Sequence, residues 1–500
     1  MKTSGELQEG QRHMEMEKMI ELIDAVSKSD LTGFKYEEDG IKLHLSKKEN
    51  TCYVTENVSA PVNMTGTASA ATVSAGVVSA EMGKTNAEGD QTLGAAAEEA
   101  VAGNIVESPL VGTFYSAPAE DAESFVKVGD RVEKGTLIAT PTGLGANIFS
   151  SAYGVVEDVL EDRIIIKPDE EQKDEYVKIP EGSKLDMVKA AGVVGMGGAG
   201  FPTQVKLAPK EPEKIDHILV NGAECEPYLT SDYRRMLDDS EKLIEGLRVM
   251  LKLFDNAKGY ICIEDNKPDC IAKLKEMVKD IPRIEVAELM TKYPQGGERF
   301  LIKAVTDREI NSAMLPADAG CVVDNVDTVI AVYEAVILGK PVMDRIVTVT
   351  GQGIKNPQNF DVLSGTDMAE LIEAAGGLTD NVSKVISGGP MMGFAMYDTH
   401  VPCIKTSSAC LCLEKDDVAD AEQTACINCG RCVGVCPGHV IPARLATFAE
   451  HGDMESFQKF DGMECCECGS CTFICPAHRP LTQAFKEMRK AVMAARRKKA

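Results

Sequence analysis

The sequence predicts a multidomain protein that combines α/β and α+β units. Its 500 residues are enough for about three or four domains. From residue 185 to 339, apolar strand-like runs alternate with amphipathic helical patterns, which indicates a mainly parallel sheet. Two matching groups of cysteines lie near the C-terminus, and a stretch rich in Ala, Gly, Ser, Thr and Val follows the first small unit. These three observations divide the chain.

The first 103 residues are predicted to form a small domain and a linker. Residues 14–30 have the pattern of a helix, and "GFKYEEDGIKLHLSK" at 33–47 is typical of an amphipathic hairpin. From about residue 59 the composition loses its periodicity, which is typical of a flexible connection. We therefore expect a domain at 1–58 and a linker at 59–103.

Residues 104–184 are predicted to form a small β-sandwich, because short strands are separated by Gly, Pro and Asp turns. This segment and the first helix and hairpin resemble the biotin carboxyl carrier protein, whose acceptor lysine follows a methionine at a hairpin tip. Here the tip is "TPTGLGAN" at 140–147, and no lysine occurs between Lys134 and Lys167. We expect no biotin on this chain, and a carrier-like domain kept for docking or packing.

The next two segments are predicted to be an α/β domain at 185–340 and a smaller α+β unit at 341–420. "HILVNG", "KGYICIED" and "RIEVAEL" are the expected strands of the first, and residues 238–254 and 268–280 are its amphipathic helices. In the second, a hairpin at 345–362, a helix at 366–378 and a strand at 385–393 are expected. A basic helix closes the chain at 481–500.

Charge and hydropathy exclude two classes of protein. The formal charge of −25 argues against a nucleic-acid surface, which needs clustered positive potential. The first residues contain no apolar stretch that would make a signal peptide. "VDTVIAVYEAVILG" carries Asp327 and Glu334 and is shorter than the roughly 18 apolar residues that a membrane span needs. The 17 cysteines then indicate metal or redox chemistry in a reducing compartment.

Eight cysteines at 421–480 form two copies of the spacing C-x-x-C-x-x-C-x-x-x-C-P. Three thiolates of each copy can converge on one cluster, and in two-cluster ferredoxins the fourth cysteine binds the other cluster. Zinc is the competing metal, but a zinc ribbon has no use for a third cysteine at the same interval. The predicted ligands of one 4Fe–4S cluster are Cys426, Cys429, Cys432 and Cys475. Those of the second are Cys465, Cys468, Cys471 and Cys436.

The remaining cysteines show no such spacing. Cys466 is one residue out of register and is predicted to bind nothing. Packed or spare thiols are expected at the other positions. Apart from Cys52, these positions are Cys225, Cys262, Cys270, Cys321, Cys403, Cys410 and Cys412.

"GMGGAGFPTQVK" at 195–206 fits G-x-G-x-x-G, but its context differs from a dinucleotide fingerprint. A helical pattern precedes it, and Phe201 and Pro202 stand where the following helix should continue. Clusters fed by a hydride donor need a cofactor that splits an electron pair, usually a flavin. The glycines allow close approach of a flat ligand, and Lys206 can supply charge. Asn221, Glu224 and Glu226 follow the next strand, where α/β sheets bind ligands.

These stretches carry a specific resemblance. "GMGGAGFPTQVKL", "VNGAECEPYLTSDYRRM", "YPQGGERFLIKAVTDREI", "DNVDTVIAVYEAV", "VTVTGQGIKNPQNFDV", "VISGGPMMG" and "CPAHRPLTQ" resemble the C subunit of the Rnf electron-transport complex. That family is similar to the flavin-bearing, NADH-oxidising subunit of respiratory complex I. Over residues 104–488 the resemblance implies a barrel-sandwich domain, a complex I-like α/β domain, an SLBB β-grasp domain and an α-helical two-cluster ferredoxin-like domain.

The resemblance also implies the residues of the site. The FMN loop would be Gly195, Gly197, Gly198, Ala199 and Gly200. Further cofactor contacts would come from Lys206, Asn221, Glu224, Gly296, Asn325 and Thr328, with Lys206, Asn325 and Thr328 at the phosphate and ribityl chain. The nicotinamide nucleotide would meet Phe201, Tyr293 and the two residues assigned to catalysis, Glu226 and Glu298. Ala223 and Gly297 replace acidic residues of complex I, so fewer flavin contacts are expected.

The predicted function is that of the NADH- and FMN-binding subunit of a ferredoxin:NAD+ oxidoreductase that pumps Na⁺ or H⁺. We expect it at the cytoplasmic face of the cell membrane, with membrane subunits and a ferredoxin-like B subunit as partners and ferredoxin as an indirect one. Two alternatives stay open, a soluble cobalamin reductase of the microcompartment type and a non-enzymatic electron-transfer scaffold. The tail carries Arg489, Lys490, Arg496, Arg497, Lys498 and Lys499. Two alternatives stay open for it: a surface for anionic lipid or an acidic partner, or a solvated terminal helix.

Overall fold

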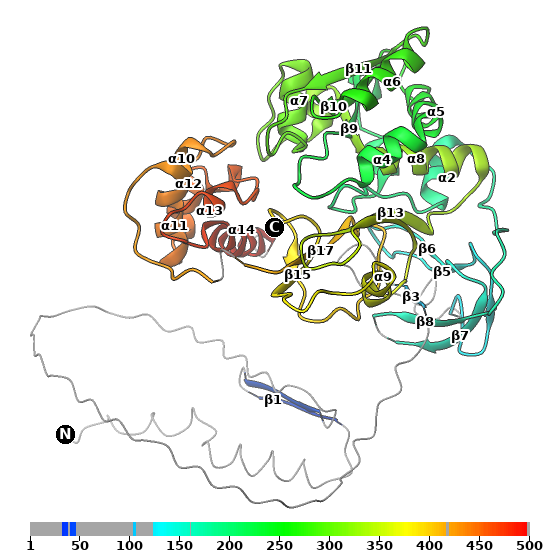
Figure 1. Ribbon diagram of the computed structural model, residues 1–500, viewed down its shortest axis with the longest axis horizontal. Helices are drawn as coiled ribbons and strands as arrows, with labels where there is room; N and C mark the ends of the chain where they lie inside the picture. The colour runs from blue at the N-terminus through cyan, green and yellow to red at the C-terminus, as the bar shows by residue number, and fades with distance from the viewer. Residues whose placement is uncertain are drawn as a thin grey trace, which may run out of the picture. The chain divides into compact units, whose positions relative to one another are not determined.

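The computed structural model of the chain describes residues 124–160, 162–416 and 420–497, and the backbone of three earlier strands. The chain divides into two compact units, Met1–Ala96 and Ala97–Ala500. In the first unit, β1 (Gly33–Glu38) pairs antiparallel with β2 (Ile41–Ser46), which confirms the predicted hairpin (Figure 1). The predicted helix at 14–30 and the linker at 59–103 lie outside the described residues.

The second unit begins with short antiparallel strands, as predicted for residues 104–184. One sheet has the order β3-β8-β7-β4, and β5 pairs with β6. Ile138, Ile164 and Ile166 are buried between these strands, and Ile164 and Ile166 share one face because side chains alternate along a strand. Residues 140–147 connect β5 to β6, where the hairpin tip is predicted. The strands are β3 (Asn104–Val106), β4 (Arg131–Val132), β5 (Leu137–Ala139), β6 (Ile148–Phe149), β7 (Gly154–Val159) and β8 (Ile164–Pro168).

A parallel sheet of order β11-β10-β9-β12 forms the centre of the α/β part, and all three predicted strands are confirmed. Helices accompany the sheet (green in Figure 1) and bury the apolar residues that recur at helical spacing. The strands are β9 (His217–Gly222), β10 (Lys258–Glu264), β11 (Ile284–Leu289) and β12 (Cys321–Asn325). The helices are α4 (Ser231–Asp238), α5 (Ser240–Leu251), α6 (Pro268–Val278), α7 (Glu298–Thr306) and α8 (Val326–Tyr333).

Close packing of α5 against α8 depends on Gly246. A β-carbon at this position would lie 2.1 Å from the carbonyl oxygen of Val329. Alanine is favoured over glycine inside a helix by about 1 kcal/mol, but an overlap with backbone atoms outweighs that gain. We expect Gly246→Ala to destabilise the protein by about 2–3 kcal/mol. Thermal unfolding measures it, and Gly143→Ala, where no atom lies within 4 Å, is the neutral control.

The predicted α+β unit is a five-stranded sheet of order β14-β13-β17-β15-β16 with one main helix. The expected hairpin is confirmed as β13 and β14, and the expected helix as α9. Strand β17 was not predicted, and it lies between β13 and β15 with four of its five residues buried. The elements are β13 (Asp344–Thr350), β14 (Gln358–Leu363), α9 (Met368–Ala374), β15 (Lys384–Ser387), β16 (Phe394–Ala395) and β17 (Ala409–Leu413).

The cysteine-rich part is helical, as predicted (orange and red in Figure 1). Leu445, Phe457 and Phe485 form its core together with apolar parts of the cysteine loops. The basic C-terminal helix is confirmed as α14 up to Arg497. Across the described residues, no helix combines the length and the apolar character of a membrane span. The helices are α10 (Arg431–Gly434), α11 (Pro442–Glu450), α12 (Met454–Lys459), α13 (Ser470–Phe473) and α14 (Leu481–Arg497).

Candidate functional site

The glycine loop connects two short helices, α2 (Lys184–Ala190) and α3 (Thr203–Lys206). This confirms that a helix precedes the loop and that no long helix follows it. The loop is closed by its own backbone, since the Gly195 amide donates to the Phe201 carbonyl at 2.8 Å and the Gly200 amide to the Gly195 carbonyl at 3.1 Å. A dinucleotide fingerprint would link a strand to a helix. The loop is therefore not a Rossmann turn.

The outer part of this loop offers an open backbone surface. Gly197, Gly198 and Ala199 are exposed. Gly198 has a φ of +146°, which favours glycine, and no atom lies within 4 Å of its absent β-carbon. A β-carbon on Gly197 would lie 3.2 Å from the β-carbon of Asn325. Because neither glycine has a side chain, the space beside the loop backbone stays open at both positions. A flat ligand can therefore lie against the loop there.

Polar residues meet at the carboxyl ends of the sheet strands, as predicted. Asn221, near the end of β9, donates its side-chain amide to the Gly296 carbonyl at 2.8 Å. Asn325 ends β12, where its oxygen accepts from the Asp327 amide at 2.9 Å and caps α8. The Asn325 nitrogen donates to Asp232 at 2.7 Å. Asn221, Gly296 and Asn325 thus lie at one edge of the sheet, where α/β proteins bind ligands.

Lys206 lies between two carboxylates at this edge. Its ammonium group donates to the Val323 carbonyl at 2.8 Å, and it lies 3.4 Å from Asp324 and 3.7 Å from Glu298. Burial raises the pKa of Asp324 to about 6, against the pull of Lys206. Among the described side chains, neither oxygen of Asp324 has a hydrogen-bond partner. Asp324 was missed in the sequence because a single acid after an apolar strand has no spacing signal.

Thr328 is fully buried beneath the glycine loop. Its hydroxyl accepts a hydrogen bond from the Met196 amide at 2.9 Å and donates to the Val194 carbonyl at 3.2 Å. The residue therefore fixes the loop backbone from below. A contact between its hydroxyl and a flavin phosphate remains a prediction.

Glu224 and Asp232 form a pair of carboxyl groups near the same edge. The Glu224 oxygens accept from the amides of Asp232 at 2.7 Å and Tyr233 at 3.1 Å, at the start of α4. Burial, and then the charge of Asp232, raises the pKa of Glu224 to about 8. Burial, and then the charge of Asp327, raises the pKa of Asp232 to about 7. The pair thus tends to hold a proton near neutral pH.

This pair predicts a pH-dependent stability. Because both pKa values are raised above 4.5 and 3.8, the folded state binds protons more tightly than the unfolded state. Stability should therefore fall as pH rises from about 4 to about 8. We expect the thermal midpoint of the flavin-free protein to drop by roughly 5 °C over this range. Asp232→Asn should flatten the profile, and Asp238→Asn on the same helix should not.

Glu226 and Tyr293 connect the α/β part to the rest of the chain. The Glu226 oxygens accept from the amides of Met391 at 3.1 Å and Met392 at 2.9 Å, in the turn after β15. Tyr293 donates its hydroxyl to the Cys468 carbonyl at 2.7 Å. Burial, and then the Glu226 charge, raises the pKa of Tyr293, so its hydroxyl remains a donor. The predicted nucleotide site therefore borders the second cysteine motif.

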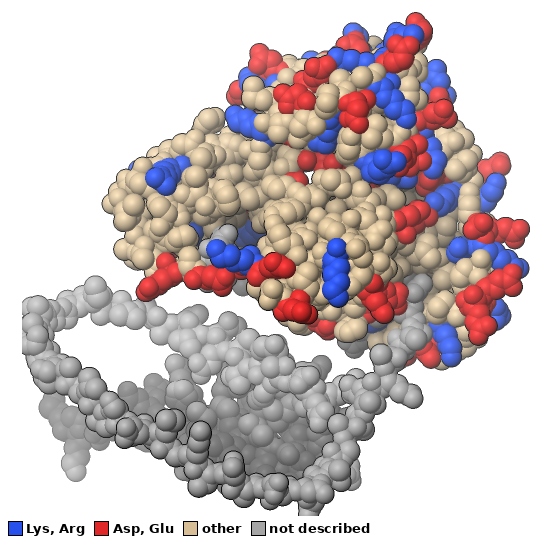
Figure 2. Space-filling model, in the orientation of Figure 1, with Lys and Arg blue, Asp and Glu red and all other residues tan. Residues whose placement is uncertain are grey.

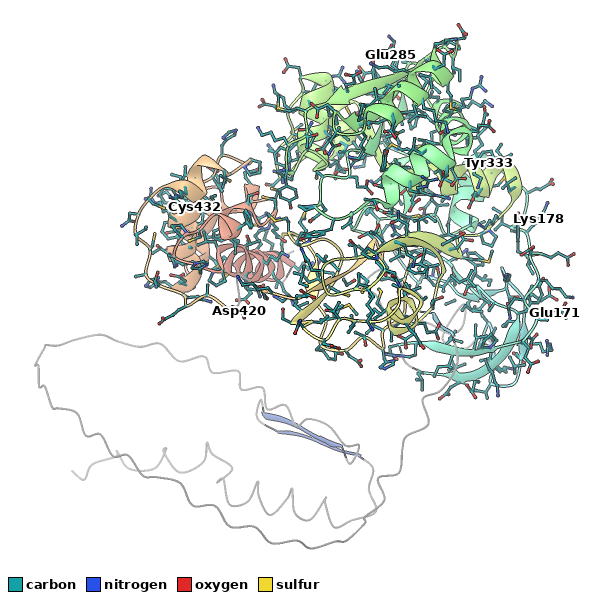
Figure 3. All side chains as sticks on the ribbon, in the orientation of Figure 1. Glu171, Lys178, Glu285, Tyr333, Asp420 and Cys432 are labelled. Atoms are coloured by element: carbon teal, nitrogen blue, oxygen red, sulfur yellow. The ribbon has the colours of Figure 1, made fainter. Side chains whose placement is uncertain are left out.

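The two cysteine motifs repeat the same backbone. Positive φ values recur at equivalent positions, and one short helix follows each tight loop. The φ values are +55° and +58° at Asn428 and Glu467, +73° and +81° at Gly430 and Gly469, and +52° and +49° at His439 and His478. Cys432, labelled in Figure 3, lies on the first of these helices, α10. The repeat in sequence is thus a repeat in structure.

Thiols of both motifs lie at one apolar core. Cys471 of the second motif is buried in this core. Cys465 of the same motif packs against it, and so do Cys432 and Cys436 of the first motif. In the described part of the chain, no group of three or more Cys, His, Asp or Glu side chains is arranged so that it could hold a metal ion. The cysteine set nevertheless has the thiolate chemistry that iron–sulfur clusters require.

Comparisons with known families support both central domains. Residues 188–334 match the family model described as the Nuo51 FMN-binding domain. Residues 346–395 match the SLBB domain. A solved structure of an NAD+-reducing NiFe hydrogenase is similar over 62% of this chain and 61% of that chain, with a TM-score of 0.45 and 19% sequence identity.

Curated relatives cover most of the chain. The C subunit of the proton-translocating ferredoxin:NAD(+) oxidoreductase complex of Clostridium ljungdahlii is 43% identical over 345 residues, which are 65% of this chain and 75% of the relative. The C subunit of the Na(+)-translocating ferredoxin:NAD(+) oxidoreductase complex of Acetobacterium woodii is 42% identical over 392 residues, or 75% of this chain and 88% of the relative. The similarity therefore extends well beyond a single domain.

Proposed function

The chain belongs to the family of C subunits of ion-translocating ferredoxin:NAD+ oxidoreductase complexes, and we propose that it is the NADH- and FMN-binding iron–sulfur subunit of such a complex. It passes electrons between NAD(H), FMN and two 4Fe–4S clusters. The names of the relatives and the FMN-binding family model favour this function over a cobalamin reductase or an electron-transfer scaffold.

One observation carries the proposal. The open glycine loop, Lys206 and the polar strand ends share one edge of the parallel sheet, and Tyr293 beside that edge donates to the Cys468 carbonyl at 2.7 Å. A bound flavin exchanges an electron pair with nicotinamide and single electrons with iron–sulfur clusters. The chain thus has a loop suited to a flavin next to a cysteine motif suited to an iron–sulfur cluster.

Several residues would hold FMN at this edge. The backbone of Gly197, Gly198 and Ala199 presents the open surface for the ring. Lys206 is already partly neutralised by Asp324 and Glu298, so it suits the hydroxyl groups of a ribityl chain as well as a phosphate. Asn221 and Asn325 supply amide groups. Gly195, Gly200, Gly296, Glu224 and Thr328 support these contacts from behind through the hydrogen bonds described above.

The nicotinamide nucleotide would lie against Phe201, Tyr293, Glu226 and Glu298. Glu298 begins α7 with its side chain 43% exposed, so it can accept hydrogen bonds from ribose hydroxyls. Both oxygens of Glu226 accept backbone amides of the turn after β15. We assign to Glu226 the ordering of that turn at the border of the nucleotide site.

The two clusters would be held by the crossed cysteine sets of the two-cluster ferredoxin pattern. Cys436 of the first motif packs against the same apolar core as Cys465 and Cys471 of the second, which supports this crossing. The α/β part touches the second motif, since Arg299 pairs with Glu464 at 2.9 Å and Tyr293 reaches Cys468. Cys426 and Cys429 of the first motif are exposed. The second cluster would therefore lie nearer the flavin and the first nearer the solvent.

The partners would be other subunits of the complex, including membrane subunits and a ferredoxin-like B subunit, with ferredoxin as an indirect partner. Both cysteine motifs carry an exposed apolar side chain, with Ile427 65% and Phe473 71% accessible. Figure 2 shows few charges over α10–α13 on the face in view. We propose that this surface meets a partner at the cytoplasmic face of the membrane. The side chain of Arg489 instead binds the carbonyls of Met463 and Cys465, so it serves the cluster domain itself.

Anaerobic purification with flavin and metal quantitation tests the function. We expect FMN, about eight irons per chain and no zinc. Addition of NADH should bleach the flavin bands and the broad cluster absorption. Protein that contains clusters but no flavin, and whose spectrum NADH leaves unchanged, would support the scaffold alternative instead.

A further inference from the structure

Two buried basic side chains of the predicted SLBB domain at 341–420 contact the backbone that leads into the glycine loop. Arg345, on β13, donates to the Met196 carbonyl at 3.2 Å. Lys405, between β16 and β17, donates to the Gly192 carbonyl at 2.8 Å. Arg345 is 5% exposed and Lys405 is 3% exposed. The two cations lie 149 and 213 positions along the chain from their partners, so the contacts are tertiary.

The backbone of Met196 is held through both its amide and its carbonyl. Its amide donates to the Thr328 hydroxyl at 2.9 Å, and its carbonyl accepts from the Arg345 guanidinium. The next residues, Gly197 and Gly198, have no side chains that could anchor them. The position of the open loop surface therefore depends on the peptide just before it.

Arg345 is itself fixed by charge and by backbone. Its guanidinium lies 3.5 Å from Asp327 and donates to the Lys405 carbonyl at 2.9 Å. Asp327 also accepts from Arg235 at 2.9 Å, and it lies in the first turn of α8, two residues after Asn325. One buried cation thus connects β13, the start of α8 and the glycine loop.

Lys405 adds a second contact at the N-terminal end of the segment that leads into the glycine loop. Besides the Gly192 carbonyl, it donates to the Asn147 carbonyl at 2.7 Å, in the hairpin tip before β6. Gly192 has a φ of +67°, and a β-carbon there would lie 2.7 Å from the Lys405 nitrogen. The ammonium group therefore packs directly against a backbone that only glycine provides.

We propose that the SLBB domain positions the flavin loop, with Arg345 as the main positioning residue and Lys405 as the second. That the ligand of this loop is FMN rests on the proposed function. Without Arg345 the loop loses its fixed geometry. The ligand then has to order the loop on binding, and the free energy of that ordering lowers the affinity.

Hydrogen exchange of residues 193–206 and FMN titration of the flavin-free protein test the proposal. Arg345→Met should raise the exchange rate of this segment and the FMN dissociation constant, each by about 10-fold, since a charged hydrogen bond is lost. Lys384→Met, which removes a cation of the same domain that binds Asp416, is the matched control and should change neither. Equal values in the two variants would overturn the proposal.

A second pair of variants guards against unfolding, because Arg345→Met leaves Asp327 with one cation fewer. Asp327→Asn alone and Asp327→Asn with Arg345→Met differ only in the anchor, and the double variant should exchange about 10-fold faster at 193–206. Equal exchange would again reject the anchor. If wild-type protein binds no FMN while the loop still exchanges faster without Arg345, the anchor stands and the proposed function fails.

Discussion

Replacing Cys468 with alanine should remove about four of about eight irons and stop electron flow beyond the flavin. Cys468 is a predicted ligand of the cluster that borders the α/β part, and Tyr293 donates to its carbonyl. Reduction of the flavin by NADH should persist, because no residue of the flavin edge is changed. Reduction of an artificial one-electron acceptor through the clusters should fall by at least about 100-fold. Iron analysis and rapid mixing measure both effects.

Cys466→Ala is the matched control for this variant. Cys466 lies in the same loop and is half-buried, but it is out of register with the ligand spacing. It should retain all the iron and the full rate of electron flow. Equal iron loss in both variants, or loss of iron only at Cys466, would contradict the ligand assignment.

Lys206→Ala should weaken FMN binding by about 30-fold and leave the iron content intact. The substitution removes the only cation that contacts Asp324 among the described ion pairs, so two carboxylates remain beside the ligand. Without Lys206 the pKa of Asp324 should rise above its present value of about 6. The defect should therefore shrink at pH 5, where Asp324 is protonated, and grow at pH 8.

Lys210→Ala provides the comparison, since Lys210 is an exposed lysine a few residues further along. It should bind FMN like the wild type at both pH values. FMN titration of the flavin-free variants gives the dissociation constants. A parallel loss of iron in Lys206→Ala would mean that the flavin and cluster domains are not separate units.

Local signals predicted much of the fold. Short apolar runs located β9, β10 and β11, and helical spacing located α5 and α6, because both signals lie within a continuous stretch of sequence. Strand β17 was missed. Its residues "ACLCL" are too few to show a period, and its place between β13 and β15 is set by pairing with distant segments.

The sequence predicted the residues of the site better than the contacts that hold these residues in place. The glycine loop, Lys206, Asn221 and Asn325 do meet at one edge, and a resemblance identified them from sequence. The partners that hold them were not predicted, because Asp324 and Arg345 contribute through contacts across more than 100 residues. Such contacts have no spacing in sequence and become visible only in the folded chain.

The central claim is that electrons enter at the flavin edge and leave through the cysteine clusters. Rapid mixing of the anaerobic protein with NADH tests it most directly, with flavin and cluster absorption followed separately. The account predicts that flavin bleaching comes first and cluster bleaching follows, and that protein stripped of FMN shows neither. Clusters that are reduced by NADH at an unchanged rate in the stripped protein would contradict it.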